Sequence, residues 1–303
     1  MWRIVLFLIF TLIVVPVVAF QFDSPPTNSE WAVLNIWIKI YIASSVFCFA
    51  VSTVTKNYSQ VDKLWSILPI IYAWVAVYES SWDGRLLLMA TLVTIWGSRL
   101  SYNFWRRGGF QWKFWEGEED YRWAILMAKP EFQPHWKWVL FNFFFISFYQ
   151  LGLIMLFTIP MVKSIAGRPL NWVDGLIALG VLFMIIFETV ADQQQWNYQN
   201  EKHEAKEGKR KMTSDYEKGF LDAGLWGIVR HPNYAAEQGV WILFYLFSVT
   251  ATGLWINWSI MGALLLILLF KGSSDFSEEI SASKYPNYSD YQKKVPRFIP
   301  DLY

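Results

Sequence analysis

Apolar runs long enough to cross a lipid bilayer dominate the sequence. Six occupy residues 2–20, 31–54, 64–78, 86–105, 136–160 and 172–190, and two more, 234–251 and 254–270, are expected to form a hairpin. A helical span needs about 20 apolar residues. Because lipid offers no water to unpaired backbone groups, such runs fold as helices. The sequence therefore predicts an all-α, polytopic integral membrane bundle with about 7–8 transmembrane helices.

Composition and charge placement agree with a membrane protein. Hydrophobic residues make up 54% of the 303 positions, above the 45–50% of ordinary soluble domains. Basic residues gather in 106–135, in 193–233 and in the C-terminal tail, which the positive-inside rule places in the cytosol. We expect a multi-pass protein in contact with membrane lipids, in the endoplasmic reticulum of a eukaryote or the inner membrane of a bacterium. The run at 2–20 is expected to be a retained anchor.

Several classes of function are disfavoured. The net charge of +1 lacks the basic excess that is typical of nucleic-acid-binding proteins. Cys48 is the single cysteine and there are 3 histidines, so neither a Cys-based nor a His-based metal site is expected. The sequence has no Walker loop, HExxH or GxSxG motif, and no GxGxxG motif after a strand.

A polar row begins inside the sixth apolar run. Glu188 and Asp192 are four residues apart and so share one face of a helix. Polar groups at membrane depth are costly and persist mainly where they bind something. One interpretation is a frayed helix end whose carboxylates reach water. The other is a face that hydrogen-bonds a ribose or a carboxamide.

A second polar group lies in the stretch GLWGIVRHPNYAAEQ, residues 224–238. Arg230 and His231 have the chemistry to bind phosphate. Asn233 and Glu237 are four residues apart at the start of a helix, where backbone N–H groups favour anions. We interpret the stretch as a binding site for an anionic cofactor at the membrane surface. The alternative is a basic loop that touches lipid headgroups.

A third group brackets the early runs. Asp62 precedes the third run, and Arg99, Tyr102 and Asn103 lie at the end of the fourth. In one interpretation Arg99 snorkels to the interface and pairs with Asp62. In the other, an acid and a phenol point at a substrate carbonyl. The tail that contains Glu278 is either an amphipathic surface helix or a lid over a cofactor.

Several motifs resemble one known family. GLWGIVRHPNYAAEQGVW, together with FKGSSDFSEEISASKYPNYSDYQKKVPRFIP, resembles the steroid 5α-reductase C-terminal domain superfamily. QVDKLWSI, WGSRLSYNFWRRGG, EEDYRW, FNFFFISFYQ and ETVADQQQWNYQ resemble its branch of uncharacterised, DUF1295-type membrane reductase-like proteins. The resemblance covers roughly Gln60 to the C-terminus. It implies residues 1–56 as N-terminal transmembrane helices and 57–303 as a reductase-like domain with a cofactor-binding C-terminal half.

The resemblance also implies a reaction and a cofactor. It implies an oxidoreductase that reduces an activated C=C bond of a lipid or steroid-like enone with NADPH, similar to a 3-oxo-5α-steroid 4-dehydrogenase. The residues that fall on cofactor-contacting positions, or are expected there from their chemistry, are Glu188, Asp192, Arg230, His231, Asn233, Glu237, Ser274 and Glu278. Around Ser274 and Glu278 the sequence lacks the basic and aromatic residues of the steroid enzymes.

The substrate-polarising residues of the steroid enzymes match less closely. Asp62 stands near their Gln-Glu pair, with Gln60 as the amide, and Tyr102 is the candidate tyrosine. We therefore expect Asp62 and Tyr102 to be catalytic, and Gln60, Arg99 and Asn103 to bind substrate.

Two other functions stay open. RHPxY followed by two glutamates also resembles the isoprenylcysteine and phospholipid methyltransferases, in which Glu278 and Glu279 would hold S-adenosylmethionine. The third possibility is a non-enzymatic lipid-binding or scaffold protein with the same fold.

Overall fold

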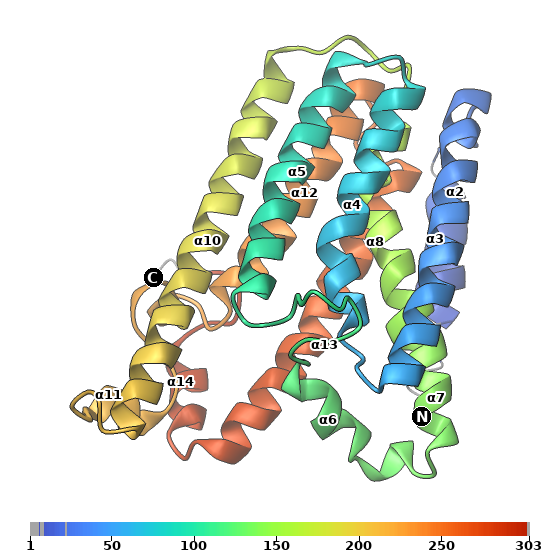
Figure 1. Ribbon diagram of the computed structural model, residues 1–303. Coiled ribbons are helices and arrows are strands. Elements are labelled where there is room, and N and C mark those ends of the chain that lie inside the picture. Colours follow the sequence, from blue (N-terminus) through green and yellow to red (C-terminus); the bar gives the residue numbers. More distant parts are fainter. Residues whose placement is uncertain (1–5, 7–8, 22, 302–303) are drawn as a thin grey trace. The chain divides into compact units, whose positions relative to one another are not determined.

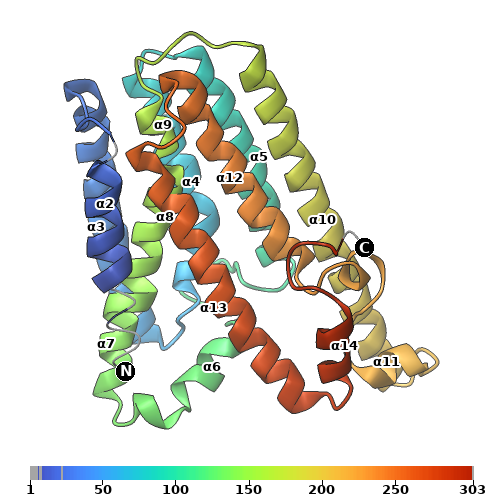
Figure 2. The ribbon, with the colours of Figure 1, turned by 180° about the vertical axis from the view of Figure 1, so that it is seen from behind.

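The computed structural model describes residues 6, 9–21 and 23–301, and this part of the chain is helical and contains no strand (Figures 1 and 2). The predicted all-α class is therefore confirmed. The helices, including short π and 3₁₀ segments marked η, are η1 (Phe10–Val14), α2 (Val15–Gln21), α3 (Asn28–Thr55), α4 (Gln60–Glu79), α5 (Gly84–Trp105), α6 (Tyr121–Met127), η2 (Pro130–Phe132), α7 (Trp136–Phe141), η3 (Asn142–Tyr149), α8 (Gln150–Thr158), α9 (Pro160–Lys163), α10 (Trp172–Lys206), α11 (Ser214–Lys218), η4 (Gly224–Gly227), α12 (Pro232–Thr252), η5 (Trp258–Ile260), α13 (Met261–Lys284) and α14 (Tyr288–Lys294).

Among the described residues, five helical stretches are long and apolar enough to cross a membrane. They are Asn28–Thr55, Gln60–Glu79, Trp136–Lys163, Trp172–Lys206 and Trp258–Lys284. The protein is therefore an integral membrane protein. Helices α5 and α12 coincide with predicted spans but fall outside this set, because polar residues within them lower their mean hydropathy. The predicted run at 2–20 lies partly outside the described residues.

The chain divides into two compact units. The first comprises Met1–Leu179 and Trp241–Leu266, and the second comprises Gly180–Val240 and Ile267–Tyr303. Helices α10, α12 and α13 each contribute residues to both units. The predicted division at residue 56 stays a prediction.

Helix caps and close packing shape the first unit. Thr27 and Glu30 form a reciprocal capping box at the start of α3, with Thr27 N donating to Glu30 Oε2 at 2.6 Å. Gly97 lets α5 approach α4, since a Cβ at that position would lie 2.6 Å from the carbonyl oxygen of Ser66. Helices α4 and α5, which carry the predicted catalytic and substrate-binding residues, are therefore in direct contact.

A buried ion pair ties three helices of the first unit together. Arg85, at the start of α5, donates through Nε and Nη2 to both carboxylate oxygens of Asp174 at 2.9 Å each. Thr250 of α12 also donates to Asp174. The arginine is 2% exposed and the aspartate 0%. Geometry of this kind is what a buried charge pair needs in order to be tolerated.

The second unit is built on the later part of α10, the start of α12 and the end of α13. A Cβ on Gly239 of α12 would lie 2.9 Å from Met184 Sδ of α10, so the two helices pack closely there. Phe220, Tyr288 and Tyr291 form a separate buried aromatic cluster. Burial raises the pKa of Tyr288 to about 12, so this phenol stays neutral and packs as a core residue.

Candidate functional site

The polar rows of α10 and α12 lie on facing surfaces of the second unit. Asn233 Nδ2 donates to Asp192 Oδ1 at 3.2 Å, which links the start of α12 to α10. Glu188, Asp192 and Glu237 are 5%, 6% and 4% exposed. The predicted face is therefore buried, and the interpretation of a frayed, water-exposed helix end is wrong for this pair of carboxylates.

The register of α10 and α12 places Glu188 and Glu237 at the same height along the two helix axes. Along α10 the contacts run from Met184 to Asp192, and along α12 the partners run in reverse order from Gly239 to Asn233. The helices are therefore antiparallel. Glu188 precedes Asp192 by one turn and Glu237 follows Asn233 by one turn, so the two glutamates stand at the same height. We call Glu188, Asp192, Asn233 and Glu237 the polar face.

Two hydrogen bonds join η4 to α10 next to Asp192. Trp226 Nε1 donates to the carbonyl of Ala191 at 3.0 Å, and Gln194 Oε1 accepts from Leu225 N at 3.0 Å. The 3₁₀ turn that precedes Arg230 is thereby fixed against α10. Three carboxylates and one amide make up the chemistry of the polar face.

Arg230 and His231 point elsewhere, toward Glu278 of α13. Arg230 Nε and His231 Nε2 lie 2.8 and 2.9 Å from Glu278 Oε1, and Arg230 Nη2 lies 3.3 Å from Oε2. Arg230 Nη1 donates to two further carbonyls, those of Gln292 and Val295. The described contacts therefore engage the guanidinium inside the protein, where the sequence interpretation expected it to face phosphate.

The C-terminal tail supplies the remaining partners of Glu278. Gln292 Nε2 and Arg297 Nη2 donate to Glu278 Oε2 at 2.8 and 3.1 Å. The tail backbone adds two contacts, because the carbonyls of Pro296 and Arg297 accept from the N–H groups of Arg230 and His231 at 2.8 and 3.1 Å. Glu278 is 2% exposed. We call Arg230, His231, Glu278, Gln292 and Arg297 the tail lock.

Arg297 and Ser274 also make structural contacts in this region. Burial lowers the pKa of Arg297, but the carboxylates of Asp275 and Glu278 outweigh burial and raise the pKa above its usual value. Ser274 is 0% exposed and donates to the carbonyl of Lys271, one turn back in its own helix. Sequence reasoning missed Gln292 and Arg297; their only signal is their place in the tail that accompanies the RHPNY motif.

In the first unit, the two predicted catalytic residues have different neighbours. Asp62 is half-buried and accepts a long contact of 3.5 Å from Trp123 Nε1. Tyr102 is 59% exposed, and its ring lies 6.0 Å from that of Trp105 and 5.8 Å from the Arg106 guanidinium. No contact among those described joins Asp62 to Tyr102, so their joint action on a carbonyl stays a prediction.

The predicted substrate-binding residues are also on α4 and α5. Gln60 is 2% exposed and donates through Nε2 to the carbonyl of Trp115 at 3.1 Å, so the structure gives it a loop-anchoring contact. Asn103 is buried and Arg99 half-buried on the last turns of α5.

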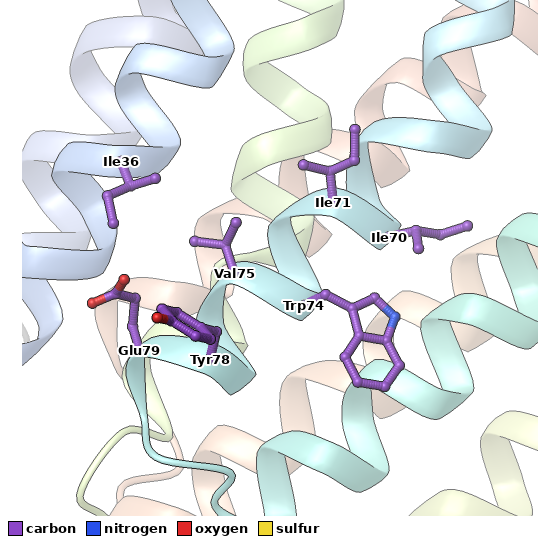
Figure 3. Close-up of a pocket in the computed structure, with 7 residues that line it drawn as sticks. All are labelled: Ile36, Ile70, Ile71, Trp74, Val75, Tyr78 and Glu79. Carbon is purple, nitrogen blue, oxygen red and sulfur yellow. The ribbon is translucent and has the colours of Figure 1, made fainter.

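An open cavity of about 500 Å³ lies between α3 and α4 of the same unit, away from these residues. Figure 3 shows its walls, which are apolar except at the end where Tyr78 and Glu79 stand; the other lining residues are Ile36, Ile70, Ile71, Trp74 and Val75.

The apolar spans and the polar face of the second unit define a polytopic membrane protein with a buried hydrogen-bonding site. A family model described as "Protein of unknown function (DUF1295)" matches residues 48–295. The chain therefore belongs to the DUF1295 family, which is of the steroid 5α-reductase-like type. It is similar to an uncharacterised protein of Schizosaccharomyces pombe, with 37% identity over 267 residues that cover 84% of this chain and 76% of the yeast protein. No solved structure matches the chain at a significant level.

Proposed function

We propose that the protein is a membrane oxidoreductase that reduces an activated C=C bond of a lipid or steroid-like enone with NADPH. The observation that supports this most is the polar face, in which Glu188, Asp192, Asn233 and Glu237 are brought together by two antiparallel helices. Buried polar side chains in a membrane protein often mark a binding site for a polar ligand. The family resemblance of the surrounding motifs supports the same assignment.

The residues of the polar face fit one end of a nicotinamide dinucleotide. Ribose hydroxyls and a carboxamide NH₂ are donors, and carboxylates accept from them. Asp192 orients Asn233, whose amide then offers a donor and an acceptor of its own. The dinucleotide would supply hydride, while the protein would bind and orient the dinucleotide and exclude water. For the phosphate end the fit is poorer, because the tail lock engages Arg230 and Arg297.

Substrate polarisation is assigned to Asp62 and Tyr102. A phenol that donates to a carbonyl oxygen withdraws electron density from the conjugated double bond and stabilises the enolate that forms. The exposed position of Tyr102 on α5 makes it accessible to a lipid-soluble molecule. Asp62, at the start of α4, would orient this contact or donate to the same oxygen.

The direct test is turnover in lipid nanodiscs. NADPH consumption is measured with a panel of enone lipids for the wild type, Tyr102→Phe and Asp62→Asn. The proposal expects loss of turnover in both variants with unchanged thermal stability. Normal turnover in both would remove these residues from the mechanism, and absence of turnover with all enones would count against the reductase.

One observation favours a second candidate, an S-adenosylmethionine-dependent methyltransferase. The polar face has three carboxylates, and its acceptor-rich chemistry suits a sulfonium cation and an amino group as well as it suits ribose. The earlier idea that Glu278 holds this cofactor is weakened by its engagement in the tail lock. Calorimetric titration with NADPH and with S-adenosylmethionine separates the two candidates. Binding of neither would favour a scaffold protein.

A further inference from the structure

The connection from α5 to α6, residues 106–120, is pinned to the start of α4 by an internal lysine. Lys63 is 6% exposed, and its Nζ donates to the carbonyls of Phe114 and Glu116 at 2.8 and 2.6 Å. Figure 1 shows this connection crossing the end of α4 at which the helix begins. A buried ammonium that donates to two loop carbonyls forms charge-assisted hydrogen bonds, which hold this part of the loop against α4.

Two neighbouring amides add to the same anchor. Gln60 Nε2 donates to the carbonyl of Trp115 at 3.1 Å, and Asn57 Nδ2 donates to that of Gly117 at 2.9 Å. Four consecutive carbonyls, from Phe114 to Gly117, are therefore held by side chains that lie next to or inside the QVDKLW motif. Gln60 and Lys63 of this motif thus act on the loop backbone.

With its backbone held inward, the loop presents large aromatic side chains outward. Trp112 is 105% exposed, Phe114 53% and Trp115 41%. We call these three residues the aromatic hook. A cluster of large exposed aromatic side chains on an ordered loop marks an interaction surface.

One contact identifies the environment of the hook. The Phe114 ring stacks on Phe47, with centroids 5.7 Å apart and planes 29° apart. Phe47 is 42% exposed and belongs to the candidate membrane span Asn28–Thr55. It lies eight residues before the end of that helix, or about 12 Å along its axis. The surface of the hook is therefore continuous with the outward face of a membrane span.

We propose that the aromatic hook is inserted in the bilayer, at the boundary between lipid headgroups and acyl chains. Trp side chains at this depth combine apolar contact with a polar N–H group, the preference that builds aromatic belts at membrane interfaces, and Phe114 adds apolar contact. The bound partner is phospholipid itself, and the anchoring residues Gln60 and Lys63 serve to hold the hook at that depth. This inference does not depend on the proposed reductase activity.

The test uses the full chain with one probe. Cys48 is the single cysteine and is buried, so a Cys48→Ala background allows Trp112→Cys to be labelled with bimane. The protein is reconstituted in phosphatidylcholine liposomes that contain nitroxide-labelled lipid, and aqueous iodide is the opposing quencher. A matched control carries the probe at Lys211→Cys, an exposed position on the connection from α10 to α11.

The proposal expects nitroxide lipid to quench the probe at 112 strongly and iodide to quench it several-fold less than at 211. Quenching by iodide alone would overturn the proposal, and protection from both quenchers would overturn it in favour of a protein contact. Adding Lys63→Met should weaken quenching of the probe at 112 by nitroxide lipid and strengthen its quenching by iodide. If that variant does not fold, Gln60→Ala provides the same anchor test, and unchanged lipid quenching in the folded variant would show that the anchor does not set the depth.

Discussion

Removing the Glu278 carboxylate should destabilise the protein more than removing any surface carboxylate. The carboxylate accepts from Arg230, His231, Gln292 and Arg297 at 2.8–3.3 Å and is 2% exposed. Glu278→Ala leaves the 8% exposed Arg230 without its counter-ion. Breaking a buried pair in this way costs about 3–5 kcal/mol in the free energy of unfolding. Retention of hydrogen bonds from Arg230 to two tail carbonyls places the expectation toward the lower end of that range.

The assay follows from the cysteine count. Because Cys48 is the single cysteine and is buried, a thiol-reactive fluorophore reports its exposure on thermal unfolding in detergent. Asp290→Ala is the control, since Asp290 forms an exposed pair with Lys293 at 3.2 Å and such pairs contribute about 0–1 kcal/mol. A melting temperature of Glu278→Ala that equals that of Asp290→Ala would refute the tail lock as a buried, stabilising unit.

Two further predictions concern the first unit. Asp174→Ala should destabilise it by about 3–5 kcal/mol, since it leaves the 2% exposed Arg85 without its counter-ion. Thr250→Val, which removes one donor, should cost only about 1 kcal/mol, and equal effects in the thiol-exposure assay would contradict this. Burial raises the pKa of Asp120, but its hydrogen bonds and ion pair with Arg122 outweigh burial and hold the pKa below its usual value. Asp120 therefore stabilises the fold above its unfolded pKa of about 3.9, and this contribution is lost as pH falls through the lower folded pKa. The melting-temperature difference between wild type and Asp120→Asn should shrink over that acid range; a constant difference would count against the ion pair.

Much of the helical layout follows from the sequence, because a lipid environment leaves few alternatives to a helix. The run predicted at 172–190 is the first part of α10, yet the helix continues to Lys206. The continuation is rich in Gln, Glu and Lys, which form helices well without being apolar. The π segment Asn142–Tyr149 was not predictable, since its wider turn depends on packing that no periodicity records.

The polar face was predictable in part for a geometric reason. Spacings of four residues placed Glu188 with Asp192 and Asn233 with Glu237, and the structure joins the two rows through one contact. The partner of a charged side chain cannot be predicted from the neighbouring sequence. Arg230 meets a carboxylate 48 positions away, so residue type suggested a phosphate ligand where the fold supplies an internal partner.

The central claim is that the polar face binds a nicotinamide cofactor, and calorimetry of NADPH binding tests it most directly. Wild type, Asp192→Ala and Glu204→Ala are compared in nanodiscs, the last being a carboxylate of the same helix that is 50% exposed. The account predicts binding to the wild type and to Glu204→Ala, and a loss of affinity of about 5- to 150-fold in Asp192→Ala, as expected for removal of one buried polar contact of about 1–3 kcal/mol. Equal NADPH affinity in all three proteins, or no binding to the wild type, would contradict it.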